Sequence, residues 1–295
     1  MSTISRVLVI GAGAMGSQIA MACALAGHDV ALHDLDAATL AKAERALRDR
    51  MAQQIVKGRR TAEDVGAAFA RLRLDTSLAA LAGADLVIEA VVEKLAVKRD
   101  LFAELDGLCP EPTILASNSS SFVPSAMASA TARPDRFVNL HFFNPALVMK
   151  CVEVVRGPQT SEATVAAALD FVASLGKTPV VLDKEIPGFV ANRLLGAVRD
   201  EALRLYEGGY ADIDAIDTAA RTALGYPMGP FELMDLTGID IGYLTKTARF
   251  DETGDPADAP SATVAALVQQ GNLGRKTGRG FYVYDEAGNR VGKGI

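Results

Sequence analysis

The sequence predicts an α/β fold: a Rossmann-type doubly wound sheet with an inserted helical hairpin, followed by an all-α C-terminal domain. Three observations predict it. Short β-branched runs alternate with helical patterns up to about residue 183, a glycine-rich turn follows the first run, and the rest of the chain is almost purely helical. At 295 residues the chain is long enough for two domains. We place them at 1–185 and 186–295, with the boundary inside 183–188.

The first domain is expected to contain seven strands, each a short run of mainly β-branched and aliphatic residues. Between the second and third, Asp36–Ala70 is rich in Ala, Arg, Lys and Glu and breaks at Lys57-Gly58, which predicts two helices in a hairpin. Beyond Pro187-Gly188 the pattern stays helical, and a last short strand is expected at Phe281–Tyr284. The seven candidate strands are Val7–Ile10, Val30–His33, Leu86–Glu89, Thr113–Ala116, Arg136–His141, Lys150–Val155 and Pro179–Leu182.

Composition and charge argue against several classes of protein. Hydrophobic residues make up 49% of the chain and charged residues 22%, as in ordinary globular proteins, and the net charge of −6 argues against nucleic acid as the main partner. No apolar run reaches the roughly 18 residues of a membrane span, and the N-terminal residues do not follow the pattern of a signal peptide. Cys23, Cys109 and Cys151 lack metal-ligand spacing, so we expect small apolar fillers, no metal site and a reducing, cytoplasmic compartment.

A glycine-rich turn lies directly between the first strand and a helical run, the context that makes such a turn a dinucleotide-binding fingerprint. Its first glycine permits the tight turn, the second lets backbone N–H groups approach a pyrophosphate, and the third allows close helix–strand packing. The helix N-terminus that follows favours a phosphate. The turn consists of Gly11, Ala12, Gly13, Ala14, Met15 and Gly16.

An acidic residue, Asp34, ends the second strand, 18 residues after Gly16. A carboxylate at this point of the fold accepts hydrogen bonds from the adenosine ribose hydroxyls. A second acid, Asp36, follows closely and no Arg comes directly after Asp34, which disfavours a 2′-phosphate. The sequence therefore predicts NAD rather than NADP as the cofactor.

Polar residues also follow two later strands, at the sheet edge where open α/β folds bind ligands. Ser117-Asn118-Ser119-Ser120-Ser121 follows the fourth strand, and His141 ends the fifth, ahead of a reversal at Asn144-Pro145. Glu153 lies twelve positions later, on the next strand. A carboxylate on an imidazole fixes its tautomer and raises its basicity, as a general base for an alcohol requires, although the spacing alone also allows a structural histidine.

The chain closely resembles the L-3-hydroxyacyl-CoA dehydrogenase family, which includes 3-hydroxybutyryl-CoA dehydrogenases. The resemblance implies NAD-dependent oxidation of a (S)-3-hydroxyacyl-CoA, a role in fatty acid metabolism through β-oxidation, and a homodimer. Its segments keep the family's order and spacing across both domains. They are Ser117–Ser121, Arg133–Phe137, His141–Pro145, Val148–Lys150, Glu153–Val155, Pro187–Phe189, Asn192-Arg193, Tyr226–Leu233 and Lys276–Tyr284.

The resemblance also implies roles for individual residues. The family's catalytic pair falls on His141 and Glu153, its substrate-contacting serine on Ser120, and its active-site asparagine on Asn192 in the second domain. Coenzyme A phosphates are expected near Lys57, with Arg59 and Arg60 as further candidates. The implied nucleotide contacts are Gly11, Gly13, Ala14, Met15, Gly16, Asp34, Glu93 and Lys98, with Asn118 beside the nicotinamide.

The chain departs from the family pattern at three positions without losing a reactive group. Ser119 replaces the usual Thr, Phe122 the usual Leu, and Asn139 a common Gly, and we expect Phe122 and Asn139 to reshape the acyl pocket. Two other functions stay open: a dehydrogenase of a free 3-hydroxy acid or sugar acid, similar to L-gulonate 3-dehydrogenase, and a non-catalytic binding protein similar to a lens crystallin. The motifs also leave the acyl chain length open, with butyrate-sized substrates and a phenylacetate-degradation intermediate both compatible.

Overall fold

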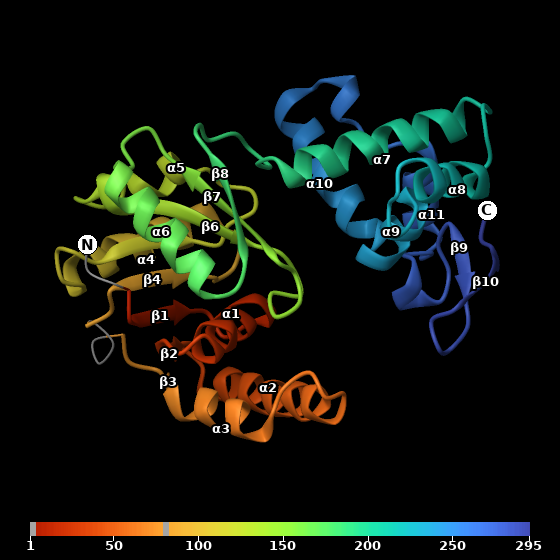
Figure 1. The fold of residues 1–295 in the computed structure, drawn as a ribbon. Coiled ribbons are helices and arrows are strands. Elements are labelled where there is room, and N and C mark those ends of the chain that lie inside the picture. The colour runs from red at the N-terminus through yellow and green to blue at the C-terminus, as the bar shows by residue number, and fades with distance from the viewer. Residues whose placement is uncertain (1–3, 79–82) are drawn as a thin grey trace. The chain divides into compact units, whose positions relative to one another are not determined.

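The computed structural model describes residues 4–78 and 83–295. The chain forms two compact units, which meet in the sequence between Val190 and Ala191 (Figure 1). The first unit carries an eight-stranded sheet in the order β3-β2-β1-β4-β5-β6-β7-β8. The strands are β1 (Arg6–Ile10), β2 (Asp29–His33), β3 (Leu72–Asp75), β4 (Leu86–Glu89), β5 (Ile114–Ser117), β6 (Phe137–Phe142), β7 (Cys151–Arg156) and β8 (Thr178–Leu182).

The sheet is parallel except between β6 and β7, which run antiparallel. The strand order reverses beside β1, which pairs with both β2 and β4, and open α/β sheets bind ligands at such a point. All seven predicted strands are present, each within one residue at either end. The edge strand β3 was not predicted, because its Leu-Arg-Leu-Asp sequence is short and half polar and depends on pairing with β2.

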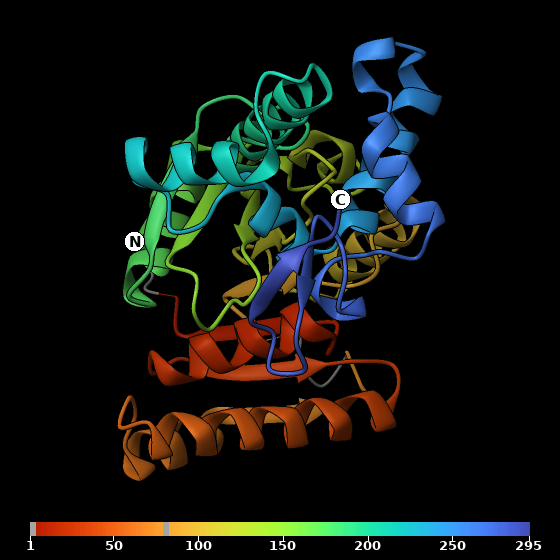
Figure 2. The same cartoon turned by 90° about the vertical axis from the view of Figure 1, so that its right-hand side faces the viewer.

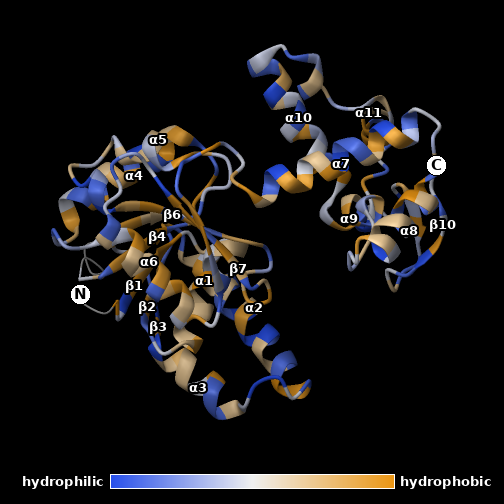
Figure 3. Cartoon of the chain, turned by 45° about the horizontal axis from the view of Figure 1, so that its top comes forward, coloured by the Kyte–Doolittle hydropathy of each residue, from blue (hydrophilic) through white to orange (hydrophobic). Residues whose placement is uncertain are grey.

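Helices cover both faces of this sheet, as the doubly wound prediction requires. Alternate residues of β1 point to opposite faces, so Val7 and Val9 share one apolar core with α1, α3 and α6, whereas Leu8 and Ile10 share the other with α4 and α5. Figure 3 shows the resulting hydrophobic colour along the central strands. The helices of this unit are α1 (Ala14–Leu25), α2 (Ala37–Val56), α3 (Ala62–Arg71), α4 (Leu95–Leu108), α5 (Pro124–Ala128) and α6 (Glu162–Ser174), and a 3-10 turn, η2, spans Pro134–Arg136.

The predicted helical hairpin is confirmed as α2 and α3, which pack on α1 and β3 (Figure 2). Asp36 begins α2 by accepting the N–H groups of Ala38 and Thr39, and Thr61 begins α3 by accepting that of Asp64. Between them the chain reverses at Gly58, whose positive φ of 65° suits a residue without a side chain. The break predicted at Lys57-Gly58 is therefore the loop of the hairpin.

The second unit is helical, as predicted, and adds a two-stranded antiparallel sheet. The expected strand at Phe281–Tyr284 is present as β9, and its partner β10 was not predicted, because Gly292 and the charged residues around it give no strand pattern. The elements are α7 (Ala191–Glu207), α8 (Ile213–Ala223), α9 (Pro230–Thr237), α10 (Ile239–Thr253), η3 (Pro256–Asp258), α11 (Ala262–Gln269), η4 (Arg275–Thr277), β9 (Tyr282–Tyr284) and β10 (Arg290–Lys293).

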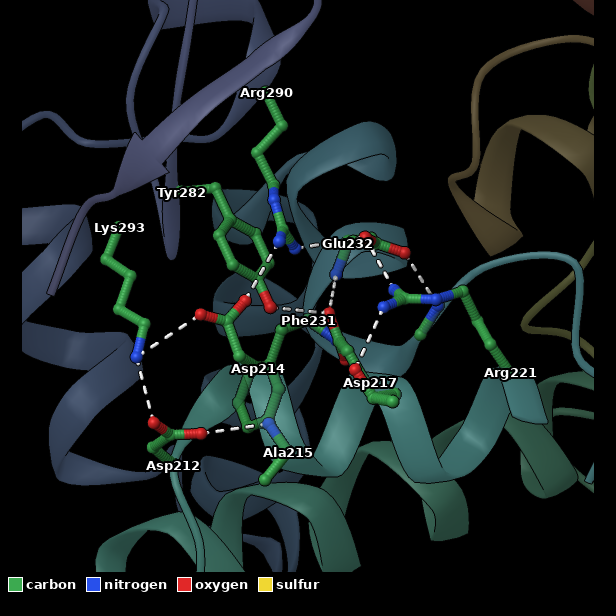
Figure 4. Close-up of polar contacts among 12 residues, drawn as sticks. Asp212, Asp214, Ala215, Asp217, Arg221, Phe231, Glu232, Tyr282, Arg290 and Lys293 are labelled. Carbon is green, nitrogen blue, oxygen red and sulfur yellow. Dashed lines mark hydrogen bonds and ion pairs between the residues drawn. The ribbon is translucent and has the colours of Figure 1, made fainter. Parts of the chain in front are cut away.

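A buried carboxylate, that of Asp217 in α8, fastens β9 and α9 together (Figure 4). It accepts hydrogen bonds from the N–H groups of Phe231 and Glu232 and from the hydroxyl of Tyr282. Burial raises the pKa of Asp217, and the N–H of Phe231 opposes that shift. A side chain at Gly229 would lie 2.2 Å from the Asp217 Cγ, so the glycine in the predicted bend lets α9 approach the carboxylate.

Replacing Asp217 by Ala should destabilise the second unit by about 3 kcal/mol or more, because three buried donors each lose a partner at about 1–3 kcal/mol. Thermal unfolding measures the loss. Glu286→Ala, on an exposed residue of the β9–β10 turn, is the matched control. Equal melting temperatures for the two variants would contradict this account of Asp217.

Candidate active site

The glycine turn after β1 has the geometry that the fingerprint predicts. Gly11 has a φ of 99°, and a Cβ on Gly16 would lie 1.8 Å from the carbonyl oxygen of Gly11, so neither position accepts a side chain. Gly13, the N-cap of α1, is exposed and has no atom within 4 Å of where a Cβ would stand. The turn therefore leaves open space in front of a helix N-terminus, which suits a pyrophosphate.

Asp34 follows β2 directly and lies against this turn. Its Oδ2 accepts the N–H of Ala12 at 2.8 Å, and its Oδ1 accepts the N–H of Asp36 at 3.1 Å. The carboxylate thus links the ends of β1 and β2 and stays half exposed. That position is compatible with the predicted ribose contact.

A buried ion network lies at the end of β4. The ammonium of Lys98, in α4, is 2.6 Å from Glu89 Oε1 and 3.0 Å from Glu93 Oε2, and Lys98 and Glu89 are almost completely buried. Burial favours a raised pKa for Glu93, but the Ser119 hydroxyl and the Lys98 ammonium outweigh it and hold that pKa below its ordinary value. Glu93 and Lys98 were predicted as site residues from the family resemblance, whereas Glu89 was not. The sequence signal for Glu89 is an acidic residue at the end of a buried apolar strand.

Glu93 also holds the serine loop that follows β5. Its Oε1 accepts the Ser119 hydroxyl at 2.6 Å and the N–H groups of Ser120 and Ser121 at 3.1 and 3.0 Å. On the sheet side, the side-chain amide of Asn139 donates to the carbonyl oxygens of Ser119 and Phe122. Asn139, a departure from the family pattern, is therefore a buried support of this loop.

Asn118 joins the serine loop to the end of β6. Its Oδ1 accepts the N–H of Phe142 at 2.9 Å, and its own N–H donates to the carbonyl of Glu89. Phe142 directly follows His141 in the chain. The loop is consequently tied to the strand that carries the histidine.

The antiparallel register of β6 and β7 places His141 directly opposite Glu153. The imidazole Nδ1 is 2.7 Å from Glu153 Oε2, and both side chains are buried. The rings of Phe143 and Phe189 pack on the imidazole, with centroids 4.5 and 5.4 Å away. The predicted pair therefore exists as a desolvated imidazole–carboxylate contact.

The remaining histidines have structural partners in the first unit. His28 pairs with the Ser174 hydroxyl, and burial lowers its pKa, whereas His33 is buried with its Nδ1 3.1 Å from the Asp75 carbonyl. All three cysteines are free thiols, and burial raises the pKa of each. Within residues 4–78 and 83–295, no group of three or more His, Cys, Asp or Glu residues could hold a metal ion, and no helix is long and apolar enough to cross a membrane.

Two further predicted site residues belong to other elements of the chain. Lys57 caps the C-terminus of α2 and is exposed, as are Arg59 and Arg60 in the same loop. Asn192 is an exposed residue in the first turn of α7, in the second unit. Its part in the site stays a prediction.

Comparison with known proteins also divides the chain into two parts. A model of the 3-hydroxyacyl-CoA dehydrogenase NAD-binding domain matches residues 6–186, and a model of the C-terminal domain of that enzyme matches residues 188–284. The chain belongs to the 3-hydroxyacyl-CoA dehydrogenase family. The resemblance and the fold class inferred from the sequence are thereby confirmed, and so is NAD as the family's cofactor.

Individual members of the 3-hydroxyacyl-CoA dehydrogenase family match over nearly the whole chain. The human mitochondrial hydroxyacyl-coenzyme A dehydrogenase is 42% identical, over 95% of this chain and 91% of its own length. A 3-hydroxybutyryl-CoA dehydrogenase of Bradyrhizobium diazoefficiens is 40% identical, over 96% of both chains. The crystal structure of (S)-3-hydroxybutyryl-CoA dehydrogenase from Ralstonia eutropha superposes with a TM-score of 0.89 at 38% identity, over 96% of this chain and 100% of that one.

Replacing Lys98 by Met should destabilise the protein by about 3–5 kcal/mol, because it leaves the buried Glu89 carboxylate without its counter-ion. Urea denaturation measures the change in the free energy of unfolding. Lys94→Met is the matched control, since Lys94 is exposed at the N-cap of the same helix. A Lys98 variant as stable as the Lys94 variant would show that the network is not needed for stability.

Proposed function

We propose that the protein catalyses the reversible, NAD-dependent oxidation of a (S)-3-hydroxyacyl-CoA to the 3-oxoacyl-CoA, with His141 as acid/base assisted by Glu153. The observation that carries the proposal is the buried His141–Glu153 pair, in a chain of this family. It stands next to the serine loop, which Asn118 ties to β6. A pair held in this way suits proton transfer to or from an alcohol.

The tautomer of His141 follows from its partner. An ionised carboxylate only accepts hydrogen bonds, so Nδ1 carries a proton and donates it to Glu153, which leaves the lone pair on Nε2. Nε2 removes the proton of the substrate 3-hydroxyl, and Glu153 stabilises the imidazolium that forms. In the reverse direction Nε2 returns the proton to the 3-oxo oxygen.

Bound NAD supplies the acceptor for the hydride that leaves C3. The open glycine turn fits its pyrophosphate, and Asp34, half exposed beside the turn, suits the adenosine ribose. Glu93 and Asn118 follow β4 and β5, on the other side of the strand-order reversal, and Lys98 lies in α4. In this proposal Glu93 and Lys98 would serve the cofactor by holding the serine loop, and Asn118 would lie beside the nicotinamide.

The proposal extends to the substrate and to the assembly. Ser120 and Asn192 would orient the hydroxyl and the thioester carbonyl, with 1–185 binding NAD and 186–295 serving the substrate and a homodimer. Exposed apolar side chains on α7 and α10 support self-association: Leu194, Leu195, Ile241 and Leu244. A cytoplasmic location is supported by the three free thiols.

The experiment that tests the proposal follows NADH absorbance on mixing the purified protein with acetoacetyl-CoA, with free acetoacetate as the control. We expect rapid NADH oxidation with the thioester alone. Oxidation with the free acid would favour a hydroxy-acid or sugar-acid dehydrogenase. Absence of turnover with either, despite NAD binding, would favour a non-catalytic binding protein.

His141→Ala should lower kcat by about 10²–10⁴-fold, the usual contribution of a general acid/base. Steady-state assays with acetoacetyl-CoA and NADH measure it. His28→Ala is the matched control, because His28 bonds Ser174 in another part of the first unit. A kcat of the His141 variant close to that of the wild type would reject the assignment.

Lys57→Ala should raise the KM for acetoacetyl-CoA by up to about fivefold without lowering kcat, if the exposed ammonium binds a coenzyme A phosphate with a strength of up to ~1 kcal/mol. Lys42→Ala, on another exposed residue of α2, provides the comparison. An unchanged KM in the Lys57 variant would remove this residue from the substrate site.

A further inference from the structure

The segment that leads from β8 to α7 is fastened to the first unit at three points. Glu185 accepts hydrogen bonds from the N–H and the hydroxyl of Ser125 in α5. Phe189 is completely buried in a small apolar cluster with Val155 and Leu182. Val190, the last residue of the unit, donates its N–H to Glu153 Oε1 at 3.0 Å. The segment is therefore attached to the carboxylate that pairs with His141.

The backbone at Phe189 is constrained. Its φ of 49° is positive, which is uncommon for a non-glycine residue and persists only where surrounding contacts hold it. Two contacts hold the backbone in this conformation. The Phe189 ring packs against the His141 imidazole, and the N–H of Val190 donates to Glu153. Backbone strain of this kind is concentrated at functional sites.

The two oxygens of Glu153 face different elements. Oε2 pairs with Nδ1 of His141 on β6, and Oε1 accepts a hydrogen bond from the N–H of Val190 in the connecting segment. Contacts at both oxygens fix the plane of the carboxylate, whereas a single contact would let it rotate about its last torsion. The orientation of the imidazole therefore depends on the course of the chain at residues 189–190.

We propose that Phe189 and the N–H of Val190 are positioning elements of the His141–Glu153 pair, so that the connection to the second unit sets the orientation of the acid/base. Ala191, where the second unit begins, directly follows Val190. A displacement of the chain at this point acts on Oε1 of Glu153 and, through the carboxylate, on His141. The proposal deepens the proposed function, on which it rests for the role of His141.

A matched pair of variants tests the Val190 N–H together with the backbone of Phe189. Val190→Pro removes the donor and restricts the backbone conformation of Phe189, whereas Val190→Ala keeps the donor and shortens only a partly exposed side chain. Relative to Val190→Ala, we expect Val190→Pro to lower kcat by up to about 10²-fold, the cost of a misplaced catalytic group, with a smaller change in the KM for acetoacetyl-CoA. An N–H that serves only to stabilise the fold would leave kcat of the folded protein unchanged.

The NMR signals of the His141 ring give a readout that needs no substrate. The chain has three histidines, so their NMR signals can be followed individually, and His141→Ala assigns the signal of interest. Because Glu153 pairs with Nδ1 of His141, a displaced carboxylate should shift the ring ¹⁵N signals of His141 between Val190→Ala and Val190→Pro. His28 and His33, whose partners lie elsewhere, serve as internal controls.

If Val190→Pro does not fold, Phe189→Leu tests the positioning role instead. Leu retains an apolar side chain in the cluster but loses the aromatic contact with the imidazole. We expect a reduced kcat and shifted ring ¹⁵N signals of His141 in a variant that still unfolds cooperatively. Ile186→Ala, on an exposed residue of the same segment, is the control. Wild-type kcat and unshifted His141 ring signals in the folded variants would overturn the proposal.

The two proposals fail in different ways. If the wild type does not turn over acetoacetyl-CoA, the proposed function fails, and the NMR signals of the His141 ring still test the positioning. If the wild type is active and His141→Ala is not, but the Val190 and Phe189 variants match their controls, only the positioning role is lost.

Discussion

The pairing of β6 with β7 is the constraint on which the rest of the site depends. An antiparallel ladder places each residue directly opposite one partner, and here His141 stands opposite Glu153. Because both side chains are buried, the imidazole and the carboxylate satisfy each other in a medium where an unpaired charge is costly. A shift of this register by one residue would turn one side chain to the other face of the sheet and abolish the pair.

Carboxylates organise the surroundings of this pair and much of the second unit. Glu93 collects two N–H groups and a hydroxyl of the serine loop, and Glu89 holds Lys98 beneath it. Asp217 and Asp235 do the same around β9, where Asp235 accepts the N–H groups of Phe281 and Tyr282. An ionised carboxylate accepts several hydrogen bonds at once, so a single residue can fix a loop that has little apolar surface of its own.

Much of the fold could be predicted because its signals are local. The strands are short runs of β-branched residues, α2 and α3 are delimited by Asp36, Gly58 and Thr61, and the glycine turn lies between a strand and a helix. The edge strand β3 and the hairpin strand β10 were not predicted, because the conformation of each depends on pairing with a partner strand rather than on its own side chains. For the site, the residue pattern supplied the glycine turn, Asp34, the serine loop, His141 and Glu153, and resemblance to the family supplied the roles and the remaining candidates.

The sequence by itself determined the fold class, the dinucleotide turn and the helical hairpin, since these depend on periodicity, glycine placement and residue type, and its resemblance to the family singled out His141 and Glu153. The tertiary structure alone decided that Glu89 neutralises Lys98, that Asn139 supports the serine loop, and that Val190 donates to Glu153. These contacts join residues that are 9, 20 and 37 positions apart. No local pattern specifies them, because each forms only once packing has brought separate elements together and removed the water that would otherwise satisfy their polar groups.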